Sequence, residues 1–182
     1  MRSMRWLLVL PVLLAALTGT SALGAAVYPE RAVTVIVPNP PGGVNDLTAR
    51  ALVEAAKPYF PQPLTVLNRP GASGVVGTTE MVQARPDGYT IALVGAGSTL
   101  LLPHVVKTTY KGPEDYMPVM KLVNIPLLFA VQAERPWNAM KDVLDHAKAN
   151  PGKVRVGTPG IGTPHHISLE ALKEKAGVNL VH

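Results

Sequence analysis

Apolar and polar positions along the chain come in blocks that predict strands followed by helices. The run of β-branched residues at 33–37 predicts a buried strand. It leads into a glycine loop and then into a helical pattern, whose predicted apolar face consists of Leu47, Ala51, Leu52, Ala55 and Tyr59. Two further pairs of strand and helix are predicted at 64–67 with 75–84 and at 90–94 with 99–106. This alternation predicts the α/β class, with mainly parallel sheets flanked by helices.

Beyond residue 110 the pattern changes before it resumes. Two apolar runs, at 119–123 and 126–131, predict strands that cross between two lobes. A helix with apolar positions at helical spacing then runs to residue 149, and Asn138 can cap its start.

A last unit repeats the order of strand, glycine loop and helix. The strand is predicted at 154–157, and the helix has Thr163 as its cap and Pro164 at its first position. Gly177 is expected to end that helix, and another strand is predicted to begin at residue 178.

The first 26 residues have the pattern of an export signal. Arg2 and Arg5 precede an apolar run at 6–17, and small residues follow as far as Ala26. Because about 12 apolar residues are fewer than the ~20 that cross a bilayer, we expect cleavage near Ala26 rather than a membrane anchor. An exported chain without cysteine is typical of a periplasmic protein, so we expect that location.

The composition is that of a folded chain. Apolar residues make up 47% and charged residues 16% of 182 residues, which excludes disorder as the main state. The absence of cysteine excludes disulfides, thiolate metal sites and cysteine nucleophiles. The net charge is +5, but two of the 17 cations lie in the leader, and aromatic residues are only 5%. We therefore expect no nucleic-acid partner.

Three predicted strands end in glycine loops at the start of a helix. Since the carboxyl ends of parallel strands share one edge of a sheet, these loops are expected to lie where a ligand binds. Unpaired N–H groups in a first helical turn suit an anion, and none of the loops contains Lys or Arg. This favours a carboxylate over a phosphate, although a single such loop serves equally well as a packing turn. The loops are Pro41-Gly42-Gly43-Val44-Asn45-Asp46, Gly95-Ala96-Gly97-Ser98-Thr99 and Gly160-Ile161-Gly162-Thr163.

Other chemistry has weaker support in the sequence. Ser98 could act as a nucleophile with His104, His165 or His166 as base, but the residues around it do not match G-x-S-x-G. A binding or capping hydroxyl is the favoured role. His165 and His166 point about 100° apart on a helix, so no metal site is predicted, and the glycine spacing indicates no nucleotide cofactor.

Three polar residues near the loops have expected roles in or beside the site. Asp46 can accept hydrogen bonds from N–H groups of its own loop or can contact a ligand. His166 is expected to be a structural donor near the third loop, and His165 to face solvent or ligand.

Six ordered motifs together resemble the Bug-type substrate-binding proteins of tripartite tricarboxylate transporters. The resemblance covers residues 28–182. The motifs are Tyr28-Pro29-Glu30-Arg31, Val37-Pro38-x-x-Pro41-Gly42-Gly43-x-x-Asp46, Asn68-Arg69-Pro70-Gly71-Ala72-Ser73-Gly74, Pro86-Asp87-Gly88-Tyr89-Thr90, Ala149-Asn150-Pro151-Gly152-Lys153 and Gly160-x-Gly162-Thr163-x-x-His166.

This resemblance implies a non-enzymatic, two-lobed periplasmic receptor that closes on a small organic acid and delivers it to membrane permease subunits. It implies lobes at 27–122 and 123–182. A sensor of the same fold is an alternative, and a periplasmic serine hydrolase is a second one. The residues that the resemblance places around the ligand are Pro41, Gly42, Gly43, Asp46, Ser98, Thr99, Gly160, Gly162, Thr163 and His165.

The chain departs from the family pattern in three ways. The family usually has small hydroxyl residues at Pro164 and His165, and Phe at Asn39, so a different ligand or an imidazole contact is expected. Family members are also longer, since their chain returns from the second lobe to complete the first. We therefore expect an incomplete second lobe, and a fragment that binds weakly or misfolds on its own.

Overall fold

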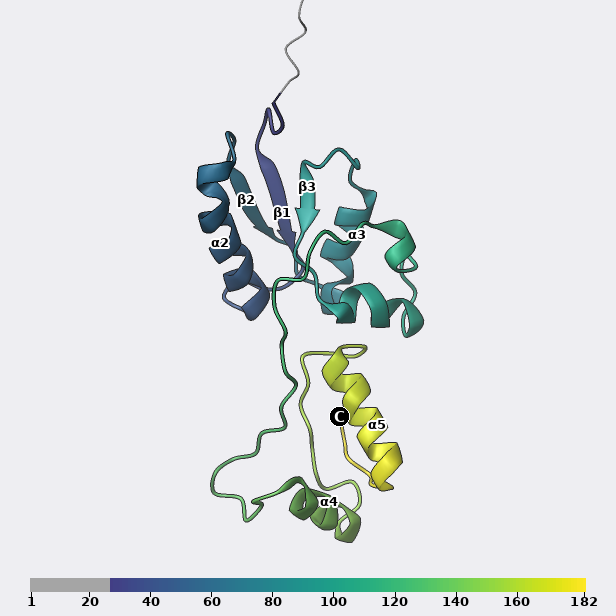
Figure 1. Cartoon of the computed structure of the whole chain (residues 1–182). Helices are drawn as coiled ribbons and strands as arrows, with labels where there is room; N and C mark the ends of the chain where they lie inside the picture. The colour runs from purple at the N-terminus through teal and green to yellow at the C-terminus, as the bar shows by residue number, and fades with distance from the viewer. Residues whose placement is uncertain (1–26) are drawn as a thin grey trace, which may run out of the picture.

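The computed structural model describes residues 27–182, so the predicted leader lies outside the described residues. Two packed parts follow one another, and a long extended segment joins them (Figure 1). The first part is built on a sheet, and the second is built on two helices. The strands of the sheet point their carboxyl ends toward the second part (Figure 1).

The sheet has three parallel strands in the order β2-β1-β3. They are β1 (Val33–Val37), β2 (Leu64–Asn68) and β3 (Thr90–Ala92). The central strand β1 is almost wholly buried, as expected for a β-branched run that pairs on both edges. Helices α2 (Val44–Ala56) and α3 (Val75–Gln83) lie on opposite sides of the sheet (Figure 1). The predicted α/β class with a parallel sheet flanked by helices is confirmed.

Helix α2 faces the sheet differently from the prediction. Its buried residues are Asp46 and Ala49, and Ala49 packs with Val35 and Val37 of β1. Leu47 and Tyr59, from the predicted apolar face, are 58% and 82% exposed. The apolar periodicity was therefore misleading. The buried carboxylate of Asp46 accepts a hydrogen bond from Asn68 of β2, and this contact turns the Asp46 side of the helix toward the sheet.

Short helical turns complete the first part of the molecule. The helix predicted at 99–106 is replaced by a π-helical turn, η3 (Gly97–Leu101), and a 3-10 turn, η4 (Leu102–His104). Three other 3-10 turns lie in connections. These are η1 (Lys57–Tyr59), η2 (Ala72–Gly74) and η5 (Pro113–Asp115).

The segment between the two parts contradicts the predicted strands at 119–123 and 126–131. It is extended but has no ladder partner among the described residues, and its large apolar side chains are exposed. A strand is stable only when its backbone N–H and C=O groups find a neighbour. Hydrophobicity alone cannot supply that neighbour, and Pro118 and Pro126 also remove two donors.

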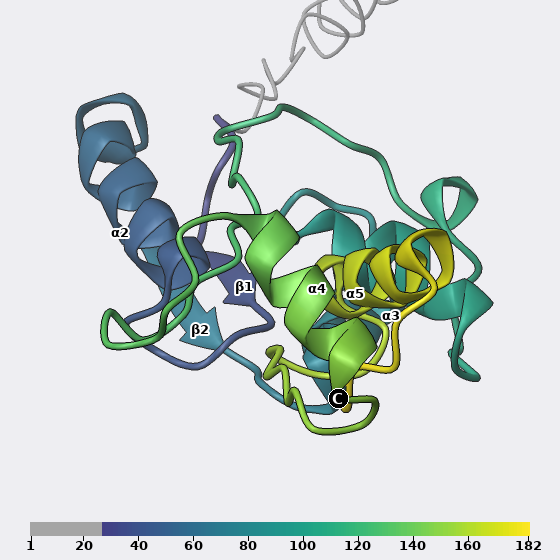
Figure 2. The same cartoon turned by 90° about the horizontal axis from the view of Figure 1, so that it is seen from below.

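The second part packs α4 (Met140–Ala149) and α5 (Pro164–Ala176) onto one small core (Figure 2). The strands predicted at 154–157 and from 178 are reduced to a single parallel bridge, Arg155 to Val181. The cap of α4 is Ala139 rather than Asn138, and Asp142 accepts the N–H groups of both residues. The buried core residues are Ala147, Val154, Leu169, Val178 and Leu180.

Helix α5 begins and ends as its sequence predicts. Thr163 caps it by accepting the N–H of His166, and Pro164 occupies the first turn. Gly177 ends it in the left-handed conformation that glycine favours. Its buried residue is Leu169, whereas Ile167 and Ala171 of the predicted face are exposed.

Candidate functional site

The first glycine loop leads from β1 into α2 and leaves the start of that helix without a side-chain cap. Asp46 lies in the first turn and is only 2% exposed. Its Oδ2 accepts hydrogen bonds from the Gly42 N–H at 2.9 Å and from Arg50 Nε at 3.0 Å. Its Oδ1 accepts one from Asn68 Nδ2 at 2.9 Å. The structure therefore confirms that Asp46 accepts an N–H of its own loop.

The charge of Asp46 is stabilised by these same partners. The Arg50 guanidinium, followed by the Gly42 N–H and the Asn68 amide, holds the pKa of Asp46 well below its usual range. Asp46 is thus ionised at neutral pH and paired with a cation at i+4. This pairing offsets the repulsion that a free carboxylate beside an anion site would cause.

The second glycine loop forms η3 at the end of the segment after β3. Ser98 and Thr99 are buried, at 6% and 4% exposure. Both hydroxyls donate to the Gly95 carbonyl, at 3.2 Å and 3.0 Å. The Tyr110 hydroxyl donates to the Ser98 carbonyl at 2.6 Å. Within the described residues, Ser98 Oγ thus bonds to a backbone carbonyl and not to a histidine base, as a capping hydroxyl would.

The third glycine loop precedes α5. Thr163 Oγ1 donates to the Gly160 carbonyl at 2.7 Å and accepts the His166 N–H at 3.4 Å. The His166 ring accepts the Gly162 N–H through Nδ1 at 3.4 Å, so it is an acceptor rather than the expected donor. In the part of the chain that the structure describes, His165 Nδ1 is buried and has no hydrogen-bond partner.

The second and third loops meet where the two parts of the molecule touch. A methyl group built on Gly97 would lie 2.8 Å from Pro164 Cδ. Ser73 Oγ, from η2, donates to the Ile161 carbonyl at 3.1 Å. A methyl group on Gly160 would lie 2.6 Å from that same Ser73 Oγ. Close backbone approach therefore requires glycine on both sides of this contact.

The first loop lies beside the second loop rather than against the third. Asn45 Nδ2 lies 3.9 Å from the position that a methyl group on Gly95 would take, and it donates to Asn39 Oδ1 at 2.7 Å. Among the described contacts, none joins Pro41, Gly42 or Gly43 to the third loop. The structure thus places nine of the ten predicted site residues on the three loops and His165 in the first turn of α5. The second and third loops meet closely, and the first lies beside the second.

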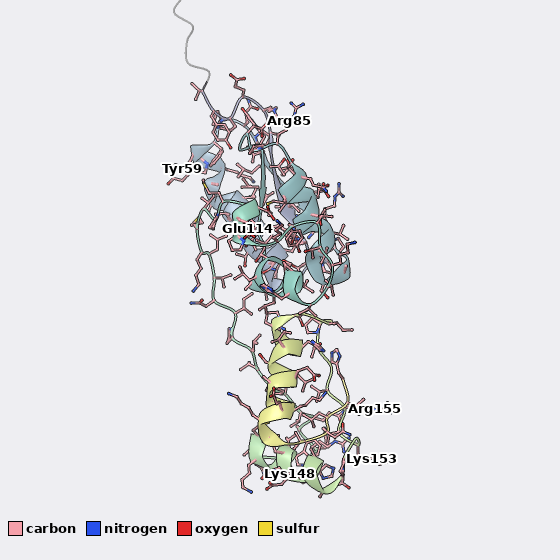
Figure 3. All side chains as sticks on the ribbon, turned by 90° about the vertical axis from the view of Figure 1, so that its right-hand side faces the viewer. Tyr59, Arg85, Glu114, Lys148, Lys153 and Arg155 are labelled. Carbon is pink, nitrogen blue, oxygen red and sulfur yellow. The ribbon has the colours of Figure 1, made fainter. Side chains whose placement is uncertain are left out.

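One cation lies at the first loop, since Arg50 pairs with Asp46 at 3.0 Å, and several others lie at the ends of the molecule. Arg85 is at one end of the molecule, whereas Lys148, Lys153 and Arg155 are at the other end (Figure 3). Within residues 27–182, no three His, Asp or Glu side chains come together as metal ligands. Any anion at the loops would be held by N–H groups, hydroxyls and the imidazole of His165.

A groove of about 520 Å³ lies elsewhere, between α3 and the sheet face opposite α2. Thr34 and Ile36 of β1 and Thr79 and Glu80 of α3 line it. This groove contains none of the predicted site residues. The three glycine loops remain the candidate site, because the first and third of them precede the long helices α2 and α5.

Sequence reasoning missed the roles of three residues that shape the site: Arg50, Asn68 and Ser73. For Arg50 the signal was available, since a cation four residues after an acid is a helical ion-pair pattern. Ser73 and Ala72 both have positive φ, 54° and 45°, at positions where only the turn-rich composition gave a hint. Asn68 begins one of the six motifs, but nothing in that motif indicated its contact with Asp46.

Comparison with known proteins decides which family this is. The sequence profile described as tripartite tricarboxylate transporter family receptor matches residues 48–182. The chain belongs to this receptor family. BugT of Bordetella pertussis is 31% identical to this receptor chain over 188 residues, which cover all of the chain and 57% of BugT. The resemblance to Bug-type proteins is therefore confirmed.

Solved structures agree with the fold of this receptor chain. MatC of Rhodopseudomonas palustris with bound malate has a TM-score of 0.74 and 28% identity, and the match covers 85% of the chain and 53% of MatC. Rpa4515 of R. palustris with adipate has a TM-score of 0.74 and 25% identity, with coverage of 85% and 52%. The chain thus spans about half the length of the relatives that it matches. No helix of the described residues is both long and apolar enough to cross a membrane.

Proposed function

We propose that this receptor chain binds a small organic acid between its lobes and serves a tripartite tricarboxylate transporter. The observation that carries the proposal is that the second and third glycine loops, which contain no Lys or Arg, meet at the contact between the two parts. The family membership supports a receptor role. The malate and adipate in two relatives support a dicarboxylate as the ligand.

The proposed site combines both lobes, which we place at 27–122 and 123–182. The first lobe contributes N–H groups at the uncapped start of α2 and the hydroxyls of the second loop. The second lobe contributes the third loop and His165, whose buried Nδ1 has no partner among the described residues. The proposed site consists of Pro41, Gly42, Gly43, Asp46, Ser98, Thr99, Gly160, Gly162, Thr163 and His165. Asp46 belongs to it as the acceptor of the Gly42 N–H.

Closure of the lobes on the ligand is the proposed mechanism. A ligand that contacts both lobes binds the closed state better than the open one, so it shifts the population toward closure. Membrane permease subunits would then recognise the closed form. Export through the predicted leader, residues 1–26, would place the receptor in the periplasm.

The first test is a native mass spectrum of the chain purified from the periplasm. We expect a processed chain that begins near Val27 and carries a small organic acid. An unprocessed chain would contradict the export proposal. Calorimetric titration with malate and with adipate then measures affinity, and a folded chain that binds no carboxylate would contradict the receptor proposal.

Two variants test the site itself. His165→Ala is expected to weaken binding because it removes the imidazole from the third loop, whereas His146→Ala, on the exposed face of α4, is the matched control. Ser98→Ala is expected to change affinity modestly, since its hydroxyl bonds mainly to the Gly95 carbonyl. An esterase activity that Ser98→Ala abolishes would instead support the hydrolase alternative.

A further inference from the structure

A polar side chain at the end of β2, Asn68, is hydrogen-bonded to the first glycine loop and is not among the proposed ligand contacts. Asn68 is the last residue of β2, and its Nδ2 donates both to Asp46 Oδ1 at 2.9 Å and to the Asn39 carbonyl at 3.1 Å. Its Oδ1 accepts a hydrogen bond from the Arg50 guanidinium at 3.2 Å. Asn68 therefore uses both donors and its acceptor to join β2, the loop and α2.

Asp46 is the centre of this arrangement. Each of its oxygens already accepts at least one hydrogen bond, and its side chain is 2% exposed. A buried carboxylate is costly unless it is paired and hydrogen-bonded, and here Arg50 and Asn68 supply both conditions. The carboxylate in turn holds the Gly42 N–H, which fixes the loop in front of α2.

Direct contact between Asp46 and a ligand carboxylate is chemically unfavourable. An ionised carboxylate is only an acceptor, so two of them share no proton. A hydroxyl on the ligand could still donate to Asp46. Malate carries such a hydroxyl and adipate does not, so the two acids distinguish a contact role from an indirect role.

We propose that Arg50 and Asn68 are positioning residues, which hold Asp46 against the Gly42 N–H and so shape the first glycine loop for a carboxylate ligand. Asp46 then acts through Gly42 rather than by touching the ligand. This inference rests on the proposed receptor function, because it assigns the loop its role in binding.

Calorimetry of the full chain with malate and with adipate tests the inference. Asn68→Ala and Asp46→Asn are each expected to weaken both acids about tenfold, the usual effect of losing a charge-assisted hydrogen bond. The double variant is expected to bind no more weakly than Asp46→Asn alone, because both changes break one linkage. Asp145→Asn is the control: it breaks the i,i+4 pair with Lys141 on α4 and should leave affinity unchanged.

Three results would overturn the inference. The first is a loss of affinity for malate alone, which would indicate direct contact with its hydroxyl. The second is additive losses of affinity in the double variant, and the third is unchanged affinity in Asn68→Ala. Should Asn68→Ala fail to fold, Arg50→Ala replaces it, since the Arg50 side chain is 52% exposed and its removal leaves no cavity in the core.

A measurement without ligand separates this inference from the receptor proposal. In NMR spectra, the Gly42 amide proton is expected to be protected from exchange in the parent chain and in Asp145→Asn. It should lose protection in Asn68→Ala and in Arg50→Ala. Equal protection in all four chains would overturn the positioning role. A parent chain that binds neither acid would contradict the receptor proposal, and the exchange data would still decide the role of Asn68.

Discussion

At the scale of single residues, the ionisation of Asp46 should control the first glycine loop over a wide pH range. Since its pKa is lowered in the folded state, its stabilising effect is fully present above the unfolded pKa and is lost as pH falls through the folded pKa. The parent loop should therefore persist at about pH 4, where an ordinary Asp is about half protonated. In Arg50→Ala the pKa of Asp46 rises, so the Gly42 amide shift should titrate at a higher pH than in the parent.

The control for this titration is Lys141→Ala. Lys141 also lowers the pKa of its partner, Asp145, but both side chains are exposed, at 80% and 55%. Exposed ion pairs of this kind contribute little to stability. The thermal midpoint of Lys141→Ala should therefore match that of the parent, both at neutral pH and at about pH 4. Identical titration of Gly42 in the parent and in Arg50→Ala would contradict the assigned cause of the pKa shift.

Residue-level prediction succeeded where the chemistry is local. The glycines before a helix and the acid in its first turn can be read from one short segment, and the Gly42 N–H does bond to Asp46. Asn68 could not be found in this way, because it comes 22 positions after Asp46 and meets it only through the pairing of β2 with β1.

At the scale of elements, the small core between α4 and α5 should unfold separately from the sheet. Leu169 is fully buried in that core, and Leu→Ala at such sites costs about 2–5 kcal/mol. We expect Leu169→Ala to remove hydrogen-exchange protection from α4 and α5 while β1 keeps its protection. Leu128→Ala is the control, since Leu128 is 81% exposed. Equal loss of protection in β1 would show a single cooperative unit instead.

A strand could be predicted from its apolar pattern where neighbouring strands are present to pair with it. The run at 33–37 became β1 because strands on both sides complete its hydrogen bonds. The runs at 119–123 and 126–131 are equally apolar, yet the described residues offer them no partner. In α2, the spacing of apolar residues predicted the wrong buried face, because the hydrogen bonds of Asp46 set the rotation of the helix. Side-chain partners and neighbouring strands come from distant parts of the sequence, so the spacing of apolar residues within one segment cannot predict them.

At the scale of the whole molecule, the two parts meet through a few glycines that leave almost no room for a side chain. Gly162 has φ of +76°, and a methyl group built on it would overlap Leu102 of η4. Gly177 has φ of +61°, but a methyl group there meets nothing within 4 Å. Both positions disfavour alanine on backbone grounds, and only Gly162 adds a clash between the two parts.

Gly162→Ala should therefore separate the parts, whereas Gly177→Ala should only destabilise α5. Small-angle X-ray scattering is expected to show a larger radius of gyration for Gly162→Ala than for the parent, and an unchanged radius for Gly177→Ala. If closure grips the ligand as proposed, affinity for malate should fall in Gly162→Ala and remain in Gly177→Ala. Equal radii for the two variants would mean that Leu102 moves aside, and that contact at this glycine does not limit how closely the parts approach.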